Sequence, residues 1–245
     1  MIPRLQKNER LDDLMRCGRK IIQNTDEFCF SIDAVLLAHY PKLHKKENVI
    51  DLGTGTGVMP LIMADDVSHI EAVELSPVMY DLAKRNVEMN DLAGKINVVE
   101  EDYRHIRDMY RSESFDLVIA NPPYRPVGNG DVNRLSGVAK ARHEFTATLS
   151  DVIEAAAWCT RYHGHFAMVH IPERLGEIFY AMHEVGFAVK RLRMVAPRAG
   201  KDPNIVLLDA VKGAAEGLKV EPELVVHEPD GSYTDEIKKI YGLNC

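Results

Sequence analysis

The sequence predicts an α/β protein built on a doubly wound, mostly parallel sheet of seven strands, with a short N-terminal elaboration. Three observations support this fold class. From Asn48 onward, short apolar runs alternate with amphipathic stretches of helical spacing, which is typical of strands joined by crossover helices. Glycine and acidic residues follow the first strands at their carboxyl ends, where open α/β sheets bind ligands. The 245 residues also suffice for one full α/β domain with a sizeable core.

Each apolar run that is short and bounded by turn residues predicts one strand. These runs lie at residues 49–52, 70–75, 96–99, 115–120, 165–171, 187–195 and 205–211. The stretches between them have helical spacing, and several begin with Ser or Pro. They predict helices at residues 57–64, 77–90, 103–110, 150–161 and 173–185.

The segment before the sheet predicts a strand at 19–24 and a helix at 31–39, whose first turn Ser31 and Asp33 can cap. We therefore expect one structural domain, with an N-terminal elaboration over residues 1–46 and the main sheet within residues 47–245. Residues 122–148 form the longest irregular stretch. A loop of that length is usually functional or disordered.

Composition and cysteine content narrow the class of protein. With 46% hydrophobic and 27% charged residues, the chain is neither collagen-like nor wholly disordered. No apolar run approaches the length of a membrane span, and the first twenty residues lack the apolar region of a signal peptide. The cysteines form no Cys-x-x-Cys pair, which argues against a zinc site or a disulfide framework. We expect a cytoplasmic protein with no membrane segment and no metal.

Charge is unevenly distributed along the chain, which carries a net charge of −7. Residues 1–46 carry 9 basic against 6 acidic side chains, and residues 123–202 carry 11 against 8. Residues 47–122 carry 6 against 15, and the remainder carries 4 against 8. This distribution fits a protein that binds a cationic cofactor centrally and an anion elsewhere. Ordinary variation of a protein surface is the alternative.

The first strand runs into the sequence Asp51-Leu52-Gly53-Thr54-Gly55-Thr56-Gly57. Alternate glycines let the backbone turn sharply and approach a ligand closely. This spacing differs from the Gly-x-Gly-x-x-Gly of dinucleotide sites, which places helix amides on a pyrophosphate. S-Adenosylmethionine instead carries an ammonium and a sulfonium group, which suit an acidic pocket. A tight turn without a ligand is the alternative.

Two further carboxylates end the next strands. Glu74 lies 23 positions beyond Asp51, where an acidic side chain can accept both hydroxyls of a cofactor ribose. Asp102 follows the third strand, within an acidic run that begins at Glu100. That run can equally cap the following helix, so contact with the adenine of the cofactor and helix capping both remain open for Asp102.

The fourth strand runs into Asn121-Pro122-Pro123-Tyr124. The amine of adenine or of an amide is a poor nucleophile because its lone pair is delocalised. The Asn121 side-chain oxygen and the Pro122 carbonyl can accept its two N–H groups and direct the lone pair toward a methyl donor. The prolines hold the turn rigid, and Tyr124 can stack on a flat substrate.

Taken together and in this order, these motifs resemble those of the class I S-adenosylmethionine-dependent amino methyltransferases, which have a Rossmann-like fold. Three further segments resemble the bacterial tRNA adenine-N6 methyltransferases that modify the purine next to the anticodon of a valine tRNA. They are residues 30–34, residues 141–144 and the seventh strand ending near Lys212-Gly213. The resemblance spans residues 11–242. The motifs that indicate an amino methyltransferase are highly specific, whereas the segments that indicate the tRNA substrate are only weakly specific.

The resemblance implies roles for individual residues. Residues 1–46 would pack on the cofactor site, and Phe30, Ser31 and Asp33 would close over the methionine end of S-adenosylmethionine. The remaining cofactor contacts would come from the side chains and turns at the strand ends, namely Asp51, Gly53, Gly55, Gly57, Glu74, Asp102 and Asn121. The target base would lie against the segment from Asn121 to Tyr124. Helix capping by Ser31 and Asp33 remains an equal alternative.

An adenosine in tRNA must be splayed or flipped to reach Asn121. Cations beside that pocket can follow the RNA backbone. They are Arg125, Arg134, Lys140 and Arg142 on the long loop, together with His143, and Arg191, Arg193, Arg198 and Lys201 farther along. Scattered solvated charges are the alternative. The histidines at 163, 165 and 170 lack ligand partners at metal spacing, so we expect them at the surface or in packing contacts.

We therefore expect methyl transfer from S-adenosylmethionine to the exocyclic N6 of an adenosine in tRNA. Ribosomal RNA, DNA or a release-factor glutamine would require the same chemistry on another substrate. A noncatalytic RNA-binding protein on this fold is a third possibility, which the intact Asp51, Asn121 and Tyr124 disfavour. A nicotinamide dehydrogenase is disfavoured by the glycine spacing. The sequence leaves the oligomeric state open.

Overall fold

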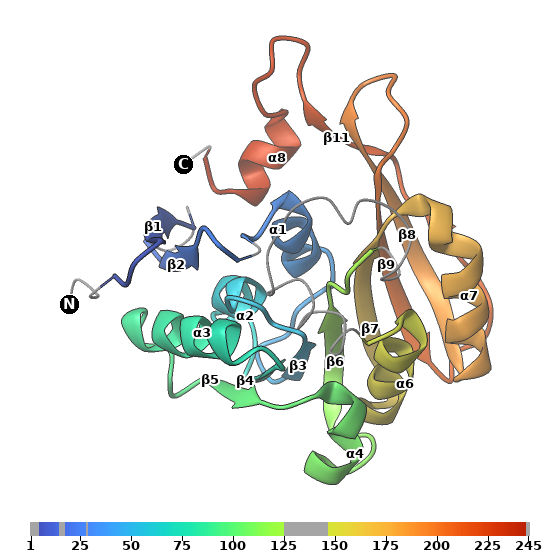
Figure 1. The fold of residues 1–245 in the computed structure, drawn as a ribbon. Coiled ribbons are helices and arrows are strands. Elements are labelled where there is room, and N and C mark those ends of the chain that lie inside the picture. Colours follow the sequence, from blue (N-terminus) through green and yellow to red (C-terminus); the bar gives the residue numbers. More distant parts are fainter. Residues whose placement is uncertain (1–4, 15–17, 28, 125–146, 244–245) are drawn as a thin grey trace.

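The computed structural model describes residues 5–14, 18–27, 29–124 and 147–243 (Figure 1). They form a nine-stranded sheet and a separate two-stranded sheet. In spatial order the large sheet contains β10 (Lys219–Val220), β8 (Phe187–Arg198), β9 (Ile205–Lys212), β7 (Thr160–His170), β6 (Phe115–Ala120), β3 (Asn48–Leu52), β4 (His69–Glu74) and β5 (Ile96–Glu100). β11 (Leu224–His227) also pairs with β8.

The strand directions confirm the predicted fold class. β3, β4, β5, β6 and β7 are parallel to one another, whereas β9 runs antiparallel to both β7 and β8. The seven predicted strands are therefore all present in a mostly parallel sheet. The sheet is extended by β10 and β11, which pair with β8 in parallel and are only two and four residues long. Strands that short give little apolar periodicity.

Helices cover both faces of the sheet. One hydrophobic cluster contains α1 (Ile32–His39), α2 (Val58–Met63) and a residue of α8 (Asp235–Ile240). The other contains α4 (Ile106–Met109), α6 (Leu149–Cys159) and α7 (Leu175–Glu184). Side chains of β3 alternate between the clusters, with Val49 in the first and Ile50 and Leu52 in the second. The remaining helix, α3 (Pro77–Met89), contacts β4 and β5.

Three predicted helices differ from the observed ones. The helix expected at 103–110 is a 3₁₀ turn, η1 (Tyr103–His105), followed by the single turn of α4. The one at 173–185 likewise starts as η2 (Pro172–Arg174) before α7. α6 ends at Cys159, and β7 starts at Thr160 rather than at His165. Polar residues in the first half of β7 hide this start, because they interrupt the apolar pattern.

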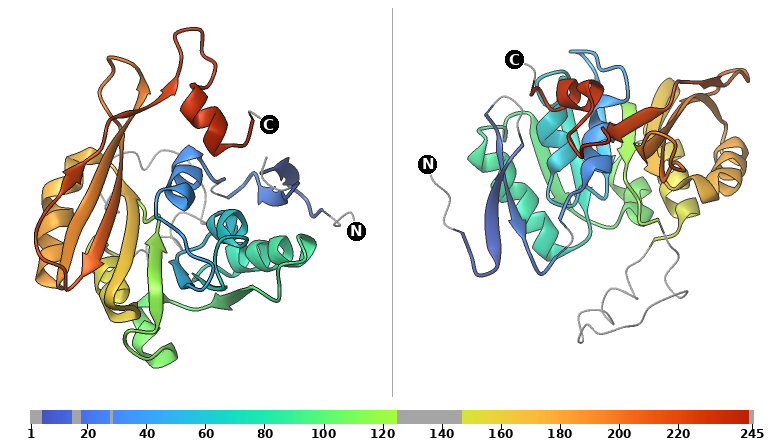
Figure 2. Two further views of the ribbon diagram at one scale, coloured as in Figure 1. Left: turned by 180° about the vertical axis from the view of Figure 1, so that it is seen from behind. Right: turned by 90° about the horizontal axis from the view of Figure 1, so that it is seen from above.

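The N-terminal elaboration contains a hairpin that the sequence only half predicts. β2 (Lys20–Asn24) is near the expected range, but its antiparallel partner β1 (Glu9–Asp13) was not expected. Both guanidinium terminal nitrogens of Arg85 on α3 lie 2.7 Å from the carboxylate of Glu9. Asn86 on α3 donates to the Ile22 carbonyl at 3.0 Å and accepts from the Ile22 amide at 2.6 Å. The hairpin is therefore fixed beside α3 (Figure 2).

The C-terminal segment contains two short elements that the sequence analysis did not predict. β11 precedes the turn at Pro229-Asp230, and α8 follows it and lies beside α1 (Figures 1 and 2). The rings of His227, Tyr233 and Tyr241 stack in succession at centroid distances of 5.2 and 5.5 Å. These ring contacts join β11 to the end of α8. A short helix of six residues gives too few turns to be recognised from its spacing.

Candidate active site

The carboxyl ends of β3, β4, β5, β6 and β7 lie at one edge of the sheet because these strands are parallel. In register, Leu52 pairs with Val73 on one side and with Ala120 on the other. The glycine turn after β3, the end of β4 at Glu74 and the turn after β6 that begins at Asn121 therefore meet at this edge. Their proximity agrees with the site predicted from the sequence.

The glycine turn needs glycine for its conformation. Gly53, Gly55 and Gly57 all have left-handed φ values, of 79°, 59° and 82°. At Gly57 a Cβ atom would also lie 3.4 Å from the Cβ of Ala83 on α3. Any other residue at Gly57 would therefore strain the backbone and press on α3. The backbone N–H groups of Gly53 and Thr54 both donate to the Val73 carbonyl at 2.9 Å, which fixes the turn to β4.

Glu74 holds this turn in place. Its carboxylate accepts the backbone N–H of Gly55 and the backbone N–H of Ser76, each at 2.8 Å. Burial raises the pKa of Glu74 above its ordinary value, although these hydrogen bonds oppose the shift. A carboxylate has acceptor sites for about four hydrogen bonds, so capacity for a sugar hydroxyl remains. Binding of the cofactor ribose by Glu74 stays a prediction.

Asp51 is fully buried, and only one of its two carboxylate oxygens has a hydrogen-bond partner among the described residues. One carboxylate oxygen accepts from the Thr54 hydroxyl at 2.6 Å, while Oδ1 has no hydrogen-bond partner among the described residues. Burial raises the pKa of Asp51 to about 7, and the negative charge of Glu74 adds to the shift. An unpaired buried carboxylate oxygen is costly and is complementary to a cation with N–H donors. The ammonium group of S-adenosylmethionine meets that requirement, so the residues present fit this cofactor.

Asp102 caps the turn that follows it. Its carboxylate accepts the Arg104 backbone N–H at 2.9 Å and the Arg104 Nε–H at 2.8 Å. Burial acts to raise the pKa of Asp102, but the Arg104 hydrogen bonds lower it overall. The capping alternative is therefore confirmed, whereas contact between Asp102 and the cofactor adenine stays a prediction.

Tyr103 is a neighbour of the glycine turn that sequence reasoning missed. A Cβ atom on Gly53 would lie 3.8 Å from Cε1 of its ring, so the aromatic side chain borders the turn. Burial raises the pKa of Tyr103 and favours the neutral phenol. Its position after the predicted adenine contact, Asp102, was the available signal. A flat ring there can pack against the cofactor.

The turn after β6 joins distant parts of the chain. Asn121 and Tyr124 are partly buried, Pro122 is buried and Pro123 is exposed. The Tyr124 hydroxyl donates to Oδ2 of Asp33 on α1, a residue 91 positions earlier. An Arg174 guanidinium nitrogen donates to the Tyr124 carbonyl at 3.4 Å. Tyr124 is therefore held at both its hydroxyl and its backbone.

The expected capping of α1 is wrong in one respect. Ser31 occupies the N-cap position but makes no side-chain cap hydrogen bond. Its hydroxyl donates to Oδ1 of the buried Asp33, whose other oxygen receives Tyr124. The backbone N–H of Phe30 donates to Gln23 Oε1 at 2.9 Å, which links the start of α1 to β2. Asp33 therefore joins the N-terminal elaboration to the turn after β6, a role that its sequence position did not indicate.

The expected substrate-binding cations divide into three groups. Arg125, Lys140, Arg142 and His143, with Arg134, lie outside the described residues. Arg191 pairs with Glu221 and Asp209, and Arg193 pairs with Glu236, so both are held by carboxylates rather than left open for phosphate. Arg198 and Lys201 are exposed at the β8–β9 connection, on the carboxyl edge of the sheet.

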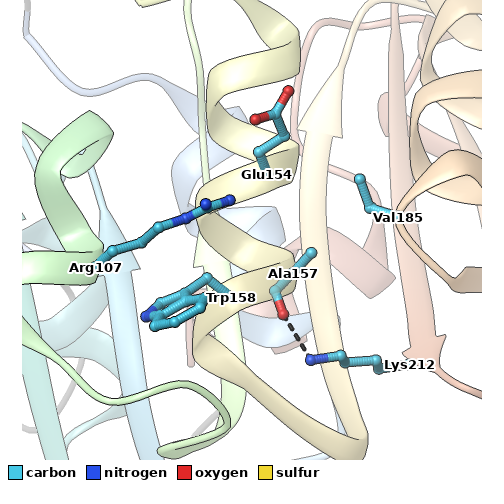
Figure 3. A pocket seen from close by; sticks show the side chains of 6 residues that line it. All are labelled: Arg107, Glu154, Ala157, Trp158, Val185 and Lys212. Atoms are coloured by element: carbon cyan, nitrogen blue, oxygen red, sulfur yellow. Dashed lines mark hydrogen bonds between the residues drawn. The ribbon is translucent and has the colours of Figure 1, made fainter.

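A cavity of about 250 Å³ lies away from these motifs (Figure 3). Trp158 of α6 forms one wall, and the Arg107 guanidinium lies 5.2 Å from its ring centroid. Lys212 at the end of β9 borders it and donates to the Ala157 carbonyl at 2.7 Å. Because β9 is antiparallel to β7, Lys212 marks the opposite edge of the sheet. Among the described residues, none of the predicted site lines this cavity.

Metal-binding clusters and membrane-spanning helices are both absent from the described residues. No group of three or more His, Cys, Asp or Glu side chains there is arranged to hold a metal ion. Within the same part of the chain, no helix combines the length and the apolar character that a bilayer crossing requires.

Residues 31–174 match the methyltransferase small domain family, and the chain belongs to this family. It is an S-adenosylmethionine-dependent methyltransferase.

Relatives narrow the type of enzyme. The chain is 30% identical to a tRNA1(Val) (adenine(37)-N6)-methyltransferase of Photorhabdus laumondii, over 92% of this chain and 88% of the relative. A tRNA1(Val) (adenine(37)-N6)-methyltransferase of Tolumonas auensis is 29% identical, over 91% and 89% of the two chains. A crystal structure described as that of a predicted O-methyltransferase from Agrobacterium tumefaciens matches with a TM-score of 0.68 and 25% identity, covering 86% of this chain and 95% of that one.

Proposed function

We propose that this enzyme transfers a methyl group from S-adenosylmethionine to the exocyclic N6 of an adenosine in tRNA, at the purine beside the anticodon. The relatives named above carry that activity in their names and align over about nine-tenths of this chain. The structural observation that carries the proposal is the juxtaposition of two turns. Ala120 of β6 pairs with Leu52 of β3, so the Asn-Pro-Pro-Tyr turn starts beside the glycine turn. A cytoplasmic location, where tRNA is modified, is part of the proposal.

The residues expected to bind the cofactor and the Asn-Pro-Pro-Tyr turn have different roles in the proposed reaction. The bound cofactor supplies an electrophilic methyl group on a sulfonium centre. Asp51 offers its unpaired Oδ1 to the ammonium group, and Glu74 offers its remaining acceptor sites to the ribose. Together with the glycine turn these residues fix the cofactor at the edge of the sheet. Orienting the cofactor before reaction lowers the entropic part of the barrier.

The Asn-Pro-Pro-Tyr turn prepares the nucleophile. The Asn121 side-chain oxygen and the Pro122 carbonyl accept the two N6–H groups of the target adenine and pull the nitrogen toward a tetrahedral geometry. Its lone pair then points at the methyl group rather than into the ring. The N–C bond would form as the sulfonium S–C bond breaks, and one N6 proton would then pass to water. The exposed Pro123 and the buried Pro122 keep the backbone of this turn rigid. Tyr124, anchored through Asp33, offers its ring as a stacking surface for the base.

The test is transfer of labelled methyl from S-adenosylmethionine to purified tRNA, ribosomal RNA and release factor, followed by nucleoside or peptide analysis. We expect N6-methyladenosine in tRNA, at the position beside the anticodon. Label confined to ribosomal RNA or to release factor would contradict the proposed substrate. Cofactor binding without transfer to any of the three would contradict the proposed reaction.

A further inference from the structure

His170 is a buried histidine that the proposed reaction does not use. It is the last residue of β7, which neighbours β6, and it is completely buried. Its ring centroid lies 5.2 Å from that of Tyr124, with the two rings tilted by 51°. His170 thus lies directly beside the turn that is expected to hold the target base. The sequence had suggested only a surface or packing role.

The hydrogen bonds of His170 define its tautomer. The backbone N–H of Ile171 donates to Nδ1 at 2.8 Å, so Nδ1 is an acceptor and carries no hydrogen. Burial lowers the pKa of His170 to about 4, and the nearby Arg174 guanidinium contributes in the same direction. The ring is therefore neutral at physiological pH. Its one hydrogen is on Nε2.

That Nε2–H group is an orphan donor. It is buried and has no hydrogen-bond partner among the described residues. Buried polar groups are almost always paired, so an unpaired one beside a substrate pocket suggests a partner that arrives with the substrate. Tyr124 is the aromatic neighbour of the imidazole, and its hydroxyl is bonded to Asp33. A base that stacks against Tyr124, which Asp33 holds in place, is expected to lie next to this imidazole.

A ring nitrogen of the target adenine can be the hydrogen-bond acceptor that Nε2–H lacks. In adenine, the amino group that Asn121 and Pro122 would hold lies next to a ring nitrogen with a free lone pair, N1 on one edge and N7 on the other. Guanine and uracil instead carry a carbonyl in place of the amino group, next to a ring N–H on the pairing edge. Two acceptors beside one donor therefore select adenine over guanine and uracil.

We propose that His170 Nε2–H donates a hydrogen bond to a ring nitrogen of the target adenine and is a specificity-determining residue of this enzyme. The inference rests on the proposed function, because it assumes that the turn after β6 holds an adenine. It adds a donor to the proposed contacts with the target base, which otherwise come from the acceptors of Asn121 and Pro122 and from the ring of Tyr124.

Two substitutions separate this role from packing. His170→Asn keeps an oxygen near the position of Nδ1 that can accept the Ile171 N–H, but places nothing at Nε2. His170→Gln extends an amide N–H toward the Nε2 position. We expect His170→Asn to lower kcat/KM for tRNA by about tenfold to a hundredfold, as for loss of one buried hydrogen bond. His170→Gln should recover most of that loss, and both should bind S-adenosylmethionine like the wild type.

His165→Asn is the matched control. His165 is on the same strand, with a partly exposed ring that pairs with Asp209 at 2.8 Å, away from Tyr124. Its variant should keep wild-type kcat/KM. A value for His170→Asn within twofold of the wild type would overturn the inference. Because the wild-type enzyme must first methylate tRNA, failure of the proposed function would show separately, as absence of label in the wild-type reaction.

A substrate experiment keeps the test valid if the His170 variants do not fold. Wild-type enzyme would be assayed on tRNA ligated from synthetic halves with adenosine, 1-deazaadenosine or 7-deazaadenosine at the target position. For one of the two deaza substrates, kcat/KM should be about tenfold or more below the value for adenosine. The nitrogen missing from that substrate is then the one that accepts the hydrogen bond from His170. If His170→Asn folds, its kcat/KM should be the same for that deaza substrate as for adenosine, because the variant already lacks the donor. Equal kcat/KM for all three substrates would contradict the inference.

Discussion

The proposed cofactor half of the site, comprising residues 51–57, Glu74 and Asp102, is held by contacts that are mostly short along the chain. Asp51 bonds Thr54, Glu74 bonds Ser76 and Asp102 bonds Arg104, with the Gly55–Glu74 bond as the longer link. The target-base half, comprising residues 121–124 with Asp33, His170 and Arg174, is held by contacts between distant segments.

This difference has a consequence for function. Tyr124 is 91 residues from Asp33 and 50 from Arg174, and each of these partners belongs to a different element. The proposed cofactor half depends on the turns that directly follow β3, β4 and β5. The target-base half depends on α1, on the turn after β6 and on η2, which carries Arg174. Substitutions in the two halves should therefore affect different steps, cofactor binding in one and base positioning in the other.

The largest effect is expected from Asn121→Ala. Loss of the acceptor for the target amine should lower kcat by about a hundredfold or more, the magnitude typical for removal of a preorganised polar group. Affinity for S-adenosylmethionine, measured by calorimetry, should stay within about threefold of wild type. Asn97→Ala, a change of the same kind at an exposed position of β5, is the control and should be silent. Wild-type turnover by Asn121→Ala would refute the acceptor mechanism.

Glu74→Ala should act on the other half. It removes the ribose acceptor and frees the backbone N–H groups of Gly55 and Ser76. Loss of charge-assisted hydrogen bonds costs about 1.5–3 kcal/mol, which weakens cofactor binding by about tenfold to 150-fold. Turnover at saturating cofactor should change less. Glu74→Gln retains one acceptor oxygen and should lie between the alanine variant and the wild type, and unchanged binding by Glu74→Ala would remove this residue from the site.

The Asp33–Tyr124 hydrogen bond can be tested by a double-mutant cycle. Tyr124→Phe keeps the stacking ring but removes the bond to Asp33, and we expect about a tenfold fall in kcat/KM for tRNA. Asp33→Asn should cause a similar fall. If the bond carries the effect, the double variant should be no worse than either single one. Multiplying effects in the double variant would show that the two residues act independently.

The smallest expected effect is the pH dependence of cofactor binding through Asp51. Its pKa of about 7 is raised above the ordinary value, so the free protein holds this proton below pH 7. Because a cation favours the carboxylate, binding releases the proton, and affinity should fall by up to about tenfold per pH unit below 7. Asp51→Asn should remove this dependence. A pH-independent affinity in the wild type would contradict the assignment.

The raised pKa of Asp51 also makes the stability of the free protein depend on pH, but in the opposite direction to cofactor affinity. A carboxyl group whose pKa is higher in the folded than in the unfolded state stabilises the fold at low pH. That contribution is lost as the pH rises from about 4 through 7. Thermal unfolding of the wild type and of Asp51→Asn across this range would isolate the contribution of Asp51.

Much of the fold and of the cofactor half could be predicted from sequence. The apolar periodicity located all seven main strands, and the Gly53–Gly57 spacing located the turn, because both signals are local. The β1 strand, β10, β11 and α8 were not predicted, since short elements on the periphery are fixed by packing rather than by their own periodicity. Arg191 and Arg193 were expected to contact the RNA backbone. Their ion pairs with Glu221 and Glu236 could not be predicted, because these partners lie about 30 and 43 positions farther along the chain.

By itself, the sequence determined the class of fold, the acidic cofactor edge and the Asn-Pro-Pro-Tyr turn, because each depends on residues within a few positions of one another. Only the tertiary structure decided that Asp33 anchors Tyr124 and that His170 is buried beside it with an unpaired N–H. These contacts depend on the order of strands in the sheet. Strand pairing joins segments far apart in the chain, and no local pattern specifies which side chains then meet.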